Sequence, residues 1–396
     1  MQITNKRKAL AIPPIFRLGF RPFFLLGALL ALIAAPLWVG ALLGAWSLPT
    51  PLGGWLAWHR HEMVFGFAGA VIAGFLLTAV QTWTGQPSLS GKPLAVLVVL
   101  WLLARGSWWQ PFPIILLLLN AIFLLAVTAA MTRLLWAARQ NRNYPIAAVL
   151  LLLTATNALT LCGVLQNNDA WQRQGSLAAV WLVLAMITLI GGRVIPFFTF
   201  RGLLRTAQVT AWPWLDWSLL AGAVIVAVLT ASGLLTQNPN TFGGILLVLL
   251  GAGHAVRLVR WFDAGLLRVP LLWSLHLAYA WLVVGCIGLA LWSFDLGVLE
   301  GQALHALTVG AIGGLILAMM ARVSLGHTGR PLELPKGFFI AFVLINIVTL
   351  LRVVGPSISY TTAMYLAAAG WSLAFLQFAV VYGPMLCKAR TDGHSG

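Results

Sequence analysis

The chain has 396 residues, of which 61% are hydrophobic and only 8% charged, and its mean hydropathy is +0.94. Soluble domains carry about 25% charged residues, so this composition excludes a soluble protein and indicates an integral membrane protein. The formal net charge of +16 does not indicate binding to nucleic acid, because the basic residues are scattered through short loops, where they mark membrane topology.

Twelve apolar stretches follow one another along the chain, and each is long enough to cross the hydrocarbon core of a membrane. The sequence therefore predicts an all-α fold, a polytopic bundle of twelve transmembrane helices in the lipid bilayer. We expect residues 1–396 to form a single transmembrane domain, with a short basic segment at 1–21 and a polar tail at 387–396. The predicted spans are 22–46, 57–82, 93–109, 111–137, 144–167, 175–198, 214–236, 241–262, 269–293, 300–323, 336–353 and 358–386.

The loop charges predict the orientation of the helices. Twenty of the 24 lysines and arginines fall at one set of helix ends, beginning with Lys6, Arg7, Lys8, Arg17 and Arg21, which we interpret as a cytoplasmic anchor. Because cytoplasmic loops are enriched in these residues, we expect both termini to be cytoplasmic and the protein to lie in the bacterial inner membrane. The opposite helix ends hold only Arg60, Arg105, Arg173 and Arg352.

The three cysteines, Cys162, Cys286 and Cys387, are far apart in the sequence and form no C-x-x-C motif. This pattern encodes neither a zinc site made of thiolates nor a covalent attachment of haem. Any haem would therefore be held by axial ligands alone.

The second predicted span opens with WHRHEMVFGFAGAVIAGF, which places His59, His61 and Glu62 at the mouth of an apolar helix. The two histidines are about 200° apart around a regular helix, so either His59 belongs to the preceding loop or only one of them binds a metal. Glu62 is expected to orient an imidazole, bind a metal or carry protons inward, and Met63 adds a thioether suited to copper(I). The spacing H-x-H-E differs from the zinc-protease motif H-E-x-x-H, so a zinc protease is not expected.

His305 opens the tenth predicted span on the same, outer side of the membrane. At an offset of 244 positions, His61 aligns with His305 and Gly66 with Gly310, and further small residues follow in both helices. Each helix therefore has a histidine above a face of small residues, which either permits close helix packing or leaves room for a flat cofactor. The alignment also suggests that the two halves of the chain share ancestry.

A second pair of histidines is expected toward the inner side. His254 and His276 lie 11 residues before and after Gly265, the midpoint of a predicted hairpin. At about 1.5 Å per residue both reach a similar depth, where they could share a metal or bracket a macrocycle. His327, at the inner end of the tenth span, is a further candidate, and Tyr279, one helical turn beyond His276, is positioned to tune that ligand.

Each of these histidines also has a structural interpretation, because a single histidine in a membrane span can simply form a hydrogen bond across helices. Six of them in two depth-matched groups favour metal binding instead. The seventh, His394, lies in the polar tail and is not a candidate.

Two arginines at inner helix ends have two interpretations. Arg193 in GGRVIPFF and Arg322 in MMARVSLGHTGRP either anchor the topology or bind haem propionates, since a planar two-pronged donor suits a carboxylate. Part of the tryptophan content is interpreted as interfacial belts, represented by Trp108, Trp109, Trp212 and Trp214.

Five segments resemble the NnrS family of bacterial membrane proteins and occur in the expected order from residue 16 to 332. They are FRLGFRPFFLLG, HRHEMVFGFAGAVIAGFLLTAVQTWTG, GGRVIPFFT, LHLAYAWL and HALTVGAIGGLILAMMARVSLGHTGRPL. The HEM and RVSLGHTGRP segments are the specific ones. The resemblance implies about twelve transmembrane helices, a non-covalently bound haem b, copper as an additional metal, and defence against nitric oxide.

On this resemblance we expect an oxidoreductase that converts two NO, two electrons and two protons into N₂O and water, with an unknown electron donor. Neutral NO can reach a site within the membrane through apolar space. Two alternatives are a transporter of haem, copper or a nitrosyl–iron species, and a haem protein that binds NO without turnover. The outer metal centre would comprise His59, His61 and His305 with Glu62, and the inner one His254, His276 and His327.

Overall fold

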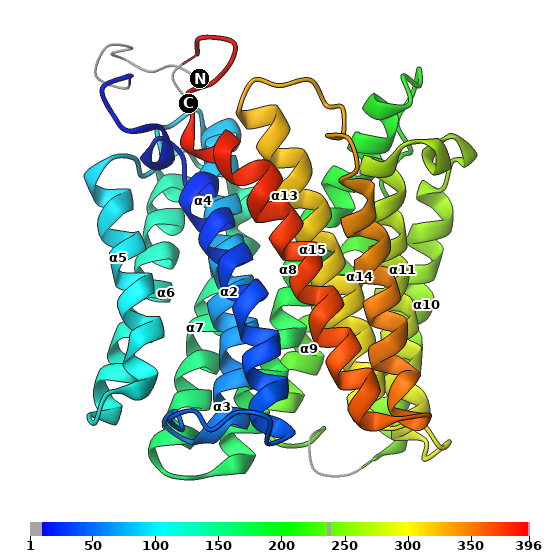
Figure 1. Ribbon diagram of the computed structural model, residues 1–396. Coiled ribbons are helices and arrows are strands. Elements are labelled where there is room, and N and C mark those ends of the chain that lie inside the picture. Colours follow the sequence, from blue (N-terminus) through cyan, green and yellow to red (C-terminus); the bar gives the residue numbers. More distant parts are fainter. Residues whose placement is uncertain (1–9, 236–238, 395–396) are drawn as a thin grey trace. The chain divides into compact units, whose positions relative to one another are not determined.

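The computed structural model describes residues 10–235 and 239–394, so Lys6, Arg7 and Lys8 of the expected anchor lie outside the described residues. Helices make up 79% of the fold, and the described residues contain no strand (Figure 1). The α-helices are α2 (Phe20–Leu42), α3 (Gly54–His61), α4 (Gly69–Thr84), α5 (Lys92–Gly106), α6 (Pro113–Ala137), α7 (Tyr144–Leu165), α8 (Asp169–Gly202), α9 (Pro213–Ala231), α10 (Thr241–Trp261), α11 (Pro270–Ser293), α12 (Glu300–His305), α13 (Gly314–His327), α14 (Phe339–Val353) and α15 (Tyr360–Cys387). Two π-helical segments are η2 (Glu62–Ala68) and η6 (Ala306–Gly313), and short 3₁₀ turns are η1 (Pro14–Phe16), η3 (Ser107–Trp109), η4 (Asn141–Asn143), η5 (Ala264–Arg268) and η7 (Gly355–Ser357).

The predicted all-α membrane fold is confirmed. Among the described residues, 11 helical stretches are long and apolar enough to span a membrane. The remaining predicted span corresponds to α5, which has 15 residues and continues as η3 before Pro111 and Pro113. Proline lacks the backbone N–H that a continuing helix needs, so the chain turns there. The orientation of the termini stays a prediction.

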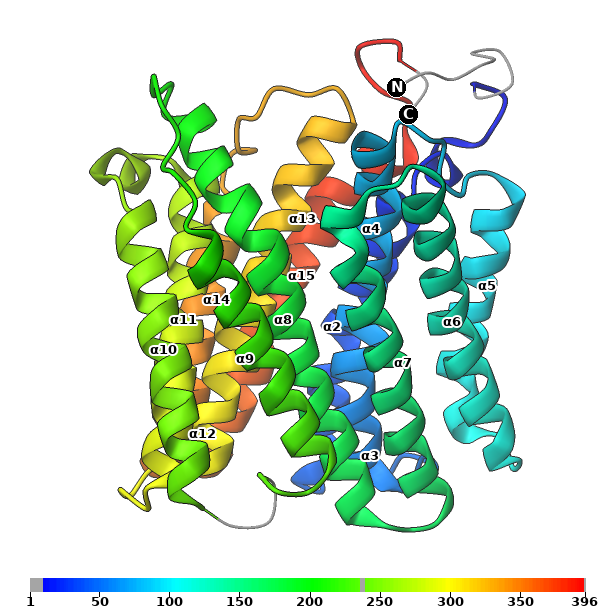
Figure 2. The same cartoon turned by 180° about the vertical axis from the view of Figure 1, so that it is seen from behind.

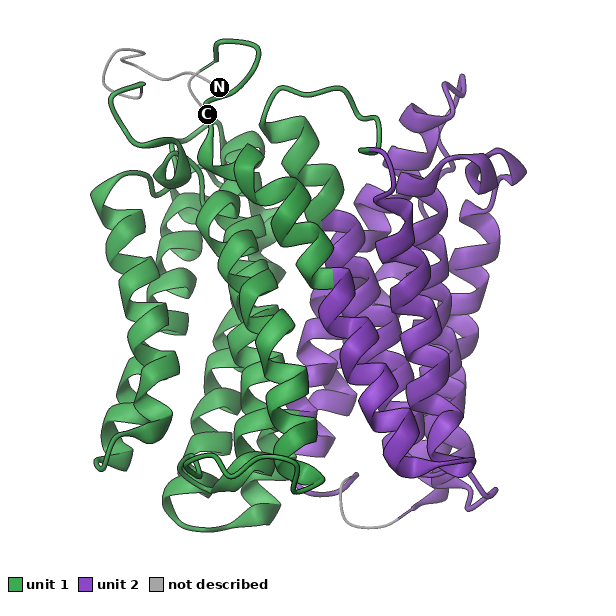
Figure 3. Cartoon of the chain, in the orientation of Figure 1, with its two compact units in different colours: residues 1–176, 320–335, 375–396 green, residues 177–319, 336–374 purple. Residues whose placement is uncertain are grey.

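The chain divides into two compact units (Figure 3). Unit 1 comprises residues 1–176, 320–335 and 375–396, and unit 2 comprises residues 177–319 and 336–374. The long helices α8, α13 and α15 each contribute residues to both units. The expectation of one transmembrane domain stays a prediction.

In unit 1, helix α2 packs along α4 and η2, and α6 packs against α4, α5 and α7 (Figures 1 and 2). Small residues permit the closest approach: a Cβ at Gly74 would lie 2.9 Å from the Cβ of Phe23 on α2. An apolar cluster that includes Trp58, Trp108 and Leu161 forms the core around α3. This core surrounds the polar residues that open η2.

In unit 2, α10 and α11 form a closely packed hairpin, as predicted, with η5 at its turn. Helix α11 also packs against α12 and η6, and η6 packs against α14. His254 and His276 are both buried on this hairpin, at 3% and 5% exposed. The hairpin therefore brings two predicted site residues into one unit.

Two helical rods change from α to π geometry directly after a histidine. Helix α3 ends at His61 and continues into η2, and α12 ends at His305 and continues into η6. These histidines are the pair that aligns at an offset of 244, so the local backbone supports the expected internal duplication. Single π turns within helices are rare and frequently lie at functional sites. Where unit 1 has Glu62, unit 2 has Ala306, so the two segments share a backbone but differ in charge.

The glycines behind these histidines serve close packing. A Cβ on Gly66 would lie 2.8 Å from the Glu62 carboxylate, and a Cβ on Gly310 would lie 2.5 Å from the Trp281 side chain. Neighbouring atoms therefore already occupy the space beside both backbones. At Gly66 and Gly310 the small residues therefore permit close packing and leave no open surface for a cofactor.

Candidate functional site

A fully buried carboxylate stands at the start of η2 in unit 1. Glu62 is 0% exposed, and its Oε2 lies 2.7 Å from Nε of Arg105, near the end of α5. Its Oε1 accepts hydrogen bonds from the Trp108 indole at 2.7 Å and from Nδ1 of His61 at 3.0 Å. Nε2 of His61 lies 3.2 Å from the side-chain oxygen of Asn157 on α7. These five residues are named the Glu62 cluster.

The partners of Glu62 explain how a charge is tolerated at this depth. A lone carboxylate in an apolar interior loses several kcal/mol of hydration, which only a charged partner and further donors offset. Arg105 supplies the opposite charge, is itself held by a hydrogen bond to Asn120 on α6, and lies 5.1 Å from the Trp101 ring centroid. Donors from three elements thus converge on one carboxylate.

Both ring nitrogens of His61 are engaged in this cluster. Nδ1 donates to Glu62, because a carboxylate oxygen can only accept. At Nε2 the Asn157 amide has two orientations: its oxygen accepts from a protonated imidazole, whereas its NH₂ group would donate to a neutral one. In the orientation described, that NH₂ nitrogen is buried and has no partner among the described residues. Metal binding by His61 stays a prediction, and it requires Nε2 to exchange its contact with Asn157.

His59 and Met63 point elsewhere in unit 1. The His59 ring stacks on Trp38 of α2 at a centroid distance of 4.8 Å. Because α3 begins at Gly54, His59 is helical, and the alternative that placed it in the preceding loop is wrong. Met63 packs beside the apolar core of Trp58 and its neighbours. The remaining alternative, that only one of His59 and His61 binds a metal, agrees with their divergent side chains.

A second polar cluster is buried in unit 2. Nδ1 of His254 on α10 lies 2.6 Å from the Tyr279 hydroxyl on α11, and Tyr279 is 0% exposed. Arg257, one turn beyond His254, donates to the same hydroxyl at 3.3 Å and to the Thr188 carbonyl at 3.1 Å. Its Nη2 forms an ion pair with Asp216 of α9 at 2.8 Å. His254, Arg257, Tyr279 and Asp216 are named the Tyr279 cluster.

The GGRV motif of α8 makes room for this cluster. A Cβ added at Gly192 would lie 1.7 Å from Nη2 of Arg257, a distance that no side chain can occupy. The second glycine of the motif therefore admits the guanidinium between α8 and α10. The cation also lies 5.0 Å from the Trp261 ring centroid, which adds an attraction between charge and aromatic face.

Two histidines of unit 2 direct Nδ1 at a backbone carbonyl of their own helix, a contact that metal-bound histidines usually make. Nδ1 of His276 lies 3.0 Å from the Leu272 carbonyl, and Nδ1 of His305 lies 2.5 Å from the Gly301 carbonyl. A carbonyl can only accept, so Nδ1 carries a hydrogen in each ring. Nε2 of His276 is buried and makes no hydrogen bond of normal geometry among the described residues, although the ring also has a backbone contact with Trp261. His276 therefore has one contact that a metal-binding histidine usually has.

The predicted groups of three histidines are distributed over both units. His59, His61 and His327 belong to unit 1, and His254, His276 and His305 belong to unit 2. In the described part of the chain, no three His, Cys, Asp or Glu side chains are gathered so that they could hold a metal ion. Tyr279, expected beside His276, forms its hydrogen bond with His254 instead. The metal-binding role of the six histidines stays a prediction.

Of the remaining predicted residues, His327 ends α13 and Arg322 lies in its last turns, whereas Arg193 lies within α8, which continues to Gly202. The ring of His327 packs against Phe20 at a centroid distance of 5.6 Å. Arg322 of α13 is 5% exposed, and Arg193 of α8 follows Gly192 in the GGRV motif. Their binding to haem propionates stays a prediction. His394 is exposed in the tail, as expected.

Sequence reasoning missed five partners of the two clusters. Trp108, interpreted as a belt residue, is 0% exposed and bonded to Glu62, so that interpretation is wrong, whereas Trp109, Trp212 and Trp214 are exposed. Arg105 and Arg257 were expected only as charges at helix ends, and Asn157 and Asp216 had no expected role. A signal was present: the chain has only eight acidic residues, and Glu62 and Asp216 lie in or beside apolar segments, where an acid needs a basic partner.

Outside the spans, the loop after α8 is tied to the turn of the α10–α11 hairpin. Arg205 binds both carboxylate oxygens of Asp263, at 2.7 Å through Nε and at 2.6 Å through Nη2. The hydrogen bonds from Arg205 and from the backbone N–H of Gly265 lower the pKa of Asp263. This pair positions the end of the hairpin that carries His254 and His276.

Comparison with known proteins agrees with the family resemblance. A family model described as NnrS protein matches residues 14–390, nearly the whole chain. A search of curated proteins found no match. The match covers the elements that carry both buried clusters.

Proposed function

We propose, from the premise that the chain belongs to the NnrS family, that it is a membrane haem protein that reduces nitric oxide to N₂O. Family membership makes it a membrane protein connected with nitric oxide. The finer proposal rests on one observation above all. His276 presents a buried ring nitrogen, Nε2, and its Nδ1 is held by the Leu272 carbonyl, within the apolar interior of unit 2.

The histidines of unit 2 would be the residues that hold a haem. A metal-bound histidine usually donates its other ring N–H to a carbonyl or carboxylate, which fixes the tautomer and orients the ring. His276 has this arrangement with Leu272, and His305 has it with Gly301. His276 would hold the iron, and His305 is the second candidate. When bound, haem iron supplies a centre that binds NO and passes electrons to it.

The described residues do not offer three histidine ligands for a copper centre. Copper sites of that kind need three donors within one coordination shell. No such group of side chains is gathered in the described part of the chain. The proposal therefore includes no reaction step at copper.

The protein's own polar groups would handle the protons. Reduction of two NO to N₂O and water consumes two electrons and two protons, and the electrons would come from an external reduced carrier. The Tyr279 hydroxyl and Nδ1 of His254, 2.6 Å apart, can pass a proton between them along one hydrogen bond. Arg257 holds the hydroxyl in place at 3.3 Å. Glu62, with three donors around it, is the corresponding proton-holding group of unit 1.

The apolar surroundings would control access. Neutral NO partitions into hydrocarbon, so the buried clusters need no polar channel for this substrate. Water and ions are excluded by the same surroundings, which keeps electrostatic interactions inside strong. The chain would thus admit NO while restricting proton movement to its few buried polar groups.

The test compares haem content in two histidine variants. Purified wild-type protein should contain iron and show a Soret band, and His276→Ala should lose most of both. His394→Ala, in the exposed tail, is the matched control and should keep the wild-type haem content. Wild-type protein without iron or a Soret band would contradict the haem proposal. Equal haem content in the three proteins would contradict the assignment of His276.

A transporter of haem, copper or nitrosyl–iron is the second candidate. It is favoured by the recurrence of an α-to-π transition behind His61 and His305 in two separate units, since many transporters are built from structural repeats. Chelation distinguishes the two functions. Metal that remains after treatment with a chelator supports a resident cofactor, and metal that leaves readily supports transport.

A further inference from the structure

An arginine cluster lies at the end of unit 1 where α2 begins and α13 and α15 end. Arg21 is 0% exposed and Arg17 is 8% exposed, although both carry a full positive charge. Arg330 and Arg390 complete the cluster, and the charges of Arg17, Arg330 and Arg390 all act on Arg21. The two buried cations, Arg17 and Arg21, require an explanation, because buried charges are normally paired.

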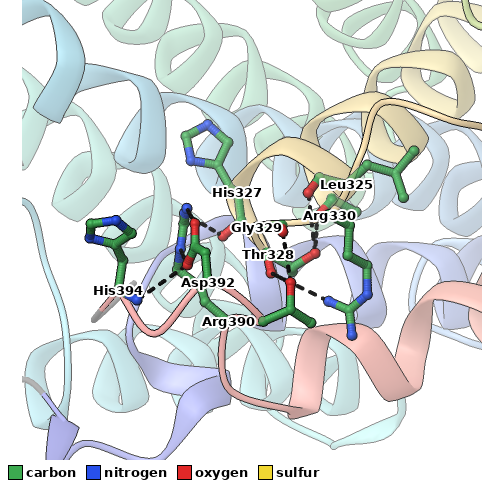
Figure 4. A network of polar contacts seen from close by, with 10 residues as sticks. Leu325, His327, Thr328, Gly329, Arg330, Arg390, Asp392 and His394 are labelled. Carbon is green, nitrogen blue, oxygen red and sulfur yellow. Dashed lines mark hydrogen bonds and ion pairs between the residues drawn. The ribbon is translucent and has the colours of Figure 1, made fainter.

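The C-terminal segment joins these residues into one structure. Nη1 of Arg21 donates to the carbonyls of Leu386 at 2.8 Å and Lys388 at 2.7 Å, and so caps the end of α15. Arg390 then donates to the His327 carbonyl at 3.0 Å (Figure 4).

Two further contacts fasten the segment to the end of α13. The backbone N–H of Thr391 donates to the Thr328 carbonyl at 3.1 Å. Gly329, at a φ of +74°, lies so close to Asp392 that a Cβ there would be 2.7 Å from its carboxyl carbon. The segment therefore keeps Arg330 and Arg390 close to Arg21.

Arg21 has one edge of its guanidinium group without a partner. Its Nε and Nη2 are buried and have no hydrogen-bond partner among the described residues, and Nη1 of Arg17 is in the same condition. Nε and Nη2 form the edge that binds an oxyanion through two parallel hydrogen bonds. Arg205 uses this edge on Asp263, and Arg390 uses it on Asp392. At Arg21 the same edge is present and buried, and no carboxylate of the described residues contacts it.

We propose that the arginine cluster binds a phosphate group, supplied by the headgroup of an anionic phospholipid. Among the contacts described for the four arginines, the only carboxylate is that of Asp392, which Arg390 already binds, so the site keeps an excess of positive charge. Phosphate offers more oxygens than a carboxylate and can accept from Arg17 as well as from the two-pronged edge of Arg21. The position at the ends of membrane-spanning helices is where headgroups lie, and basic pockets between such helices bind anionic lipids.

The experiment uses the full-length protein, stripped of lipid in detergent. The probes are short-chain phosphatidylglycerol, phosphatidylcholine with the same chains, and inorganic phosphate, with dissociation constants measured by calorimetry. We expect saturable binding of phosphatidylglycerol and at least about tenfold weaker binding in Arg21→Gln, as for the loss of one charge-assisted two-pronged contact. Arg330→Gln, at a half-buried loop position outside the spans, should weaken binding without removing the contacts that cap α15.

A control variant and competition with inorganic phosphate complete the experiment. Arg133→Gln, an exposed arginine of α6, should bind phosphatidylglycerol like the wild type. Inorganic phosphate that competes fully at equal concentration would identify free phosphate as the source of the same phosphate chemistry. The proposal would be overturned if neither phosphatidylglycerol nor inorganic phosphate bound saturably. Wild-type affinity for phosphatidylglycerol in both Arg21→Gln and Arg330→Gln would also overturn it. The result does not depend on haem content.

Discussion

The pair of Glu62 and Arg105 permits a direct measurement of what burial does to an ion pair in this protein. Its Oε2–Nε distance is 2.7 Å, and the side chains are 0% and 12% exposed. A second pair, Arg60 with Asp169, has the same distance of 2.7 Å but side chains that are 24% and 71% exposed. The distances match, so the comparison contrasts a buried ion pair, in which Glu62 has two further donors, with an exposed one.

We expect Glu62→Gln to destabilise the protein by about 3–5 kcal/mol, because it leaves the Arg105 charge buried without its counter-charge. Arg60→Gln removes an exposed pair and should cost about 0–1 kcal/mol. The double variant Glu62→Gln with Arg105→Gln should be more stable than the sum of the single effects predicts, because neither charge is then left alone.

The assay is equilibrium unfolding of each purified variant in detergent, followed by the signal of tertiary structure. A free energy change for Glu62→Gln no larger than that for Arg60→Gln would refute the reasoning. Additive effects of Glu62→Gln and Arg105→Gln would do so as well, since they would mean that the two groups do not interact.

Two further predictions concern unit 2. Gly192→Ala should destabilise the protein by about 1–3 kcal/mol, because its Cβ would displace the guanidinium of Arg257, whereas Gly301→Ala, with open space around it, should be close to neutral in the same unfolding assay. The pKa of Asp263 is lowered in the folded protein, so its pairing with Arg205 stabilises the fold. This stabilisation is fully present above the unfolded pKa of about 3.9 and is lost as the pH falls through the lower pKa of the folded state. Asp263→Asn should therefore flatten the pH dependence of unfolding in the acidic range, and an unchanged profile would contradict the assigned pairing.

The sequence predicted the architecture well because membrane spans are specified locally. Each apolar stretch becomes a helix since backbone polar groups must be paired within the segment. The turn of the α10–α11 hairpin was therefore found close to Gly265, in η5. The bounds of α8 were less accurate: the predicted span of 175–198 lies within a helix from Asp169 to Gly202, because polar residues at both ends of the apolar stretch are helical as well.

The partners inside the site were harder to predict because they come from different helices. The spacing of His276 and Tyr279 suggested a shared role, yet the Tyr279 hydroxyl contacts His254 on the neighbouring helix. Trp108 looked like an interfacial residue by its sequence position, but its indole is turned inward to Glu62. Such pairs depend on the rotation of each helix about its axis, which composition does not specify.

The most direct test of the central claim is the product formed from nitric oxide. Purified, haem-containing protein is incubated anaerobically with NO and a chemical reductant, and N₂O is measured by gas chromatography. The account predicts one N₂O for every two NO consumed, repeated over many turnovers and strongly reduced in His276→Ala. Haem-containing protein that binds NO and forms no N₂O above the level of the reductant alone would contradict it.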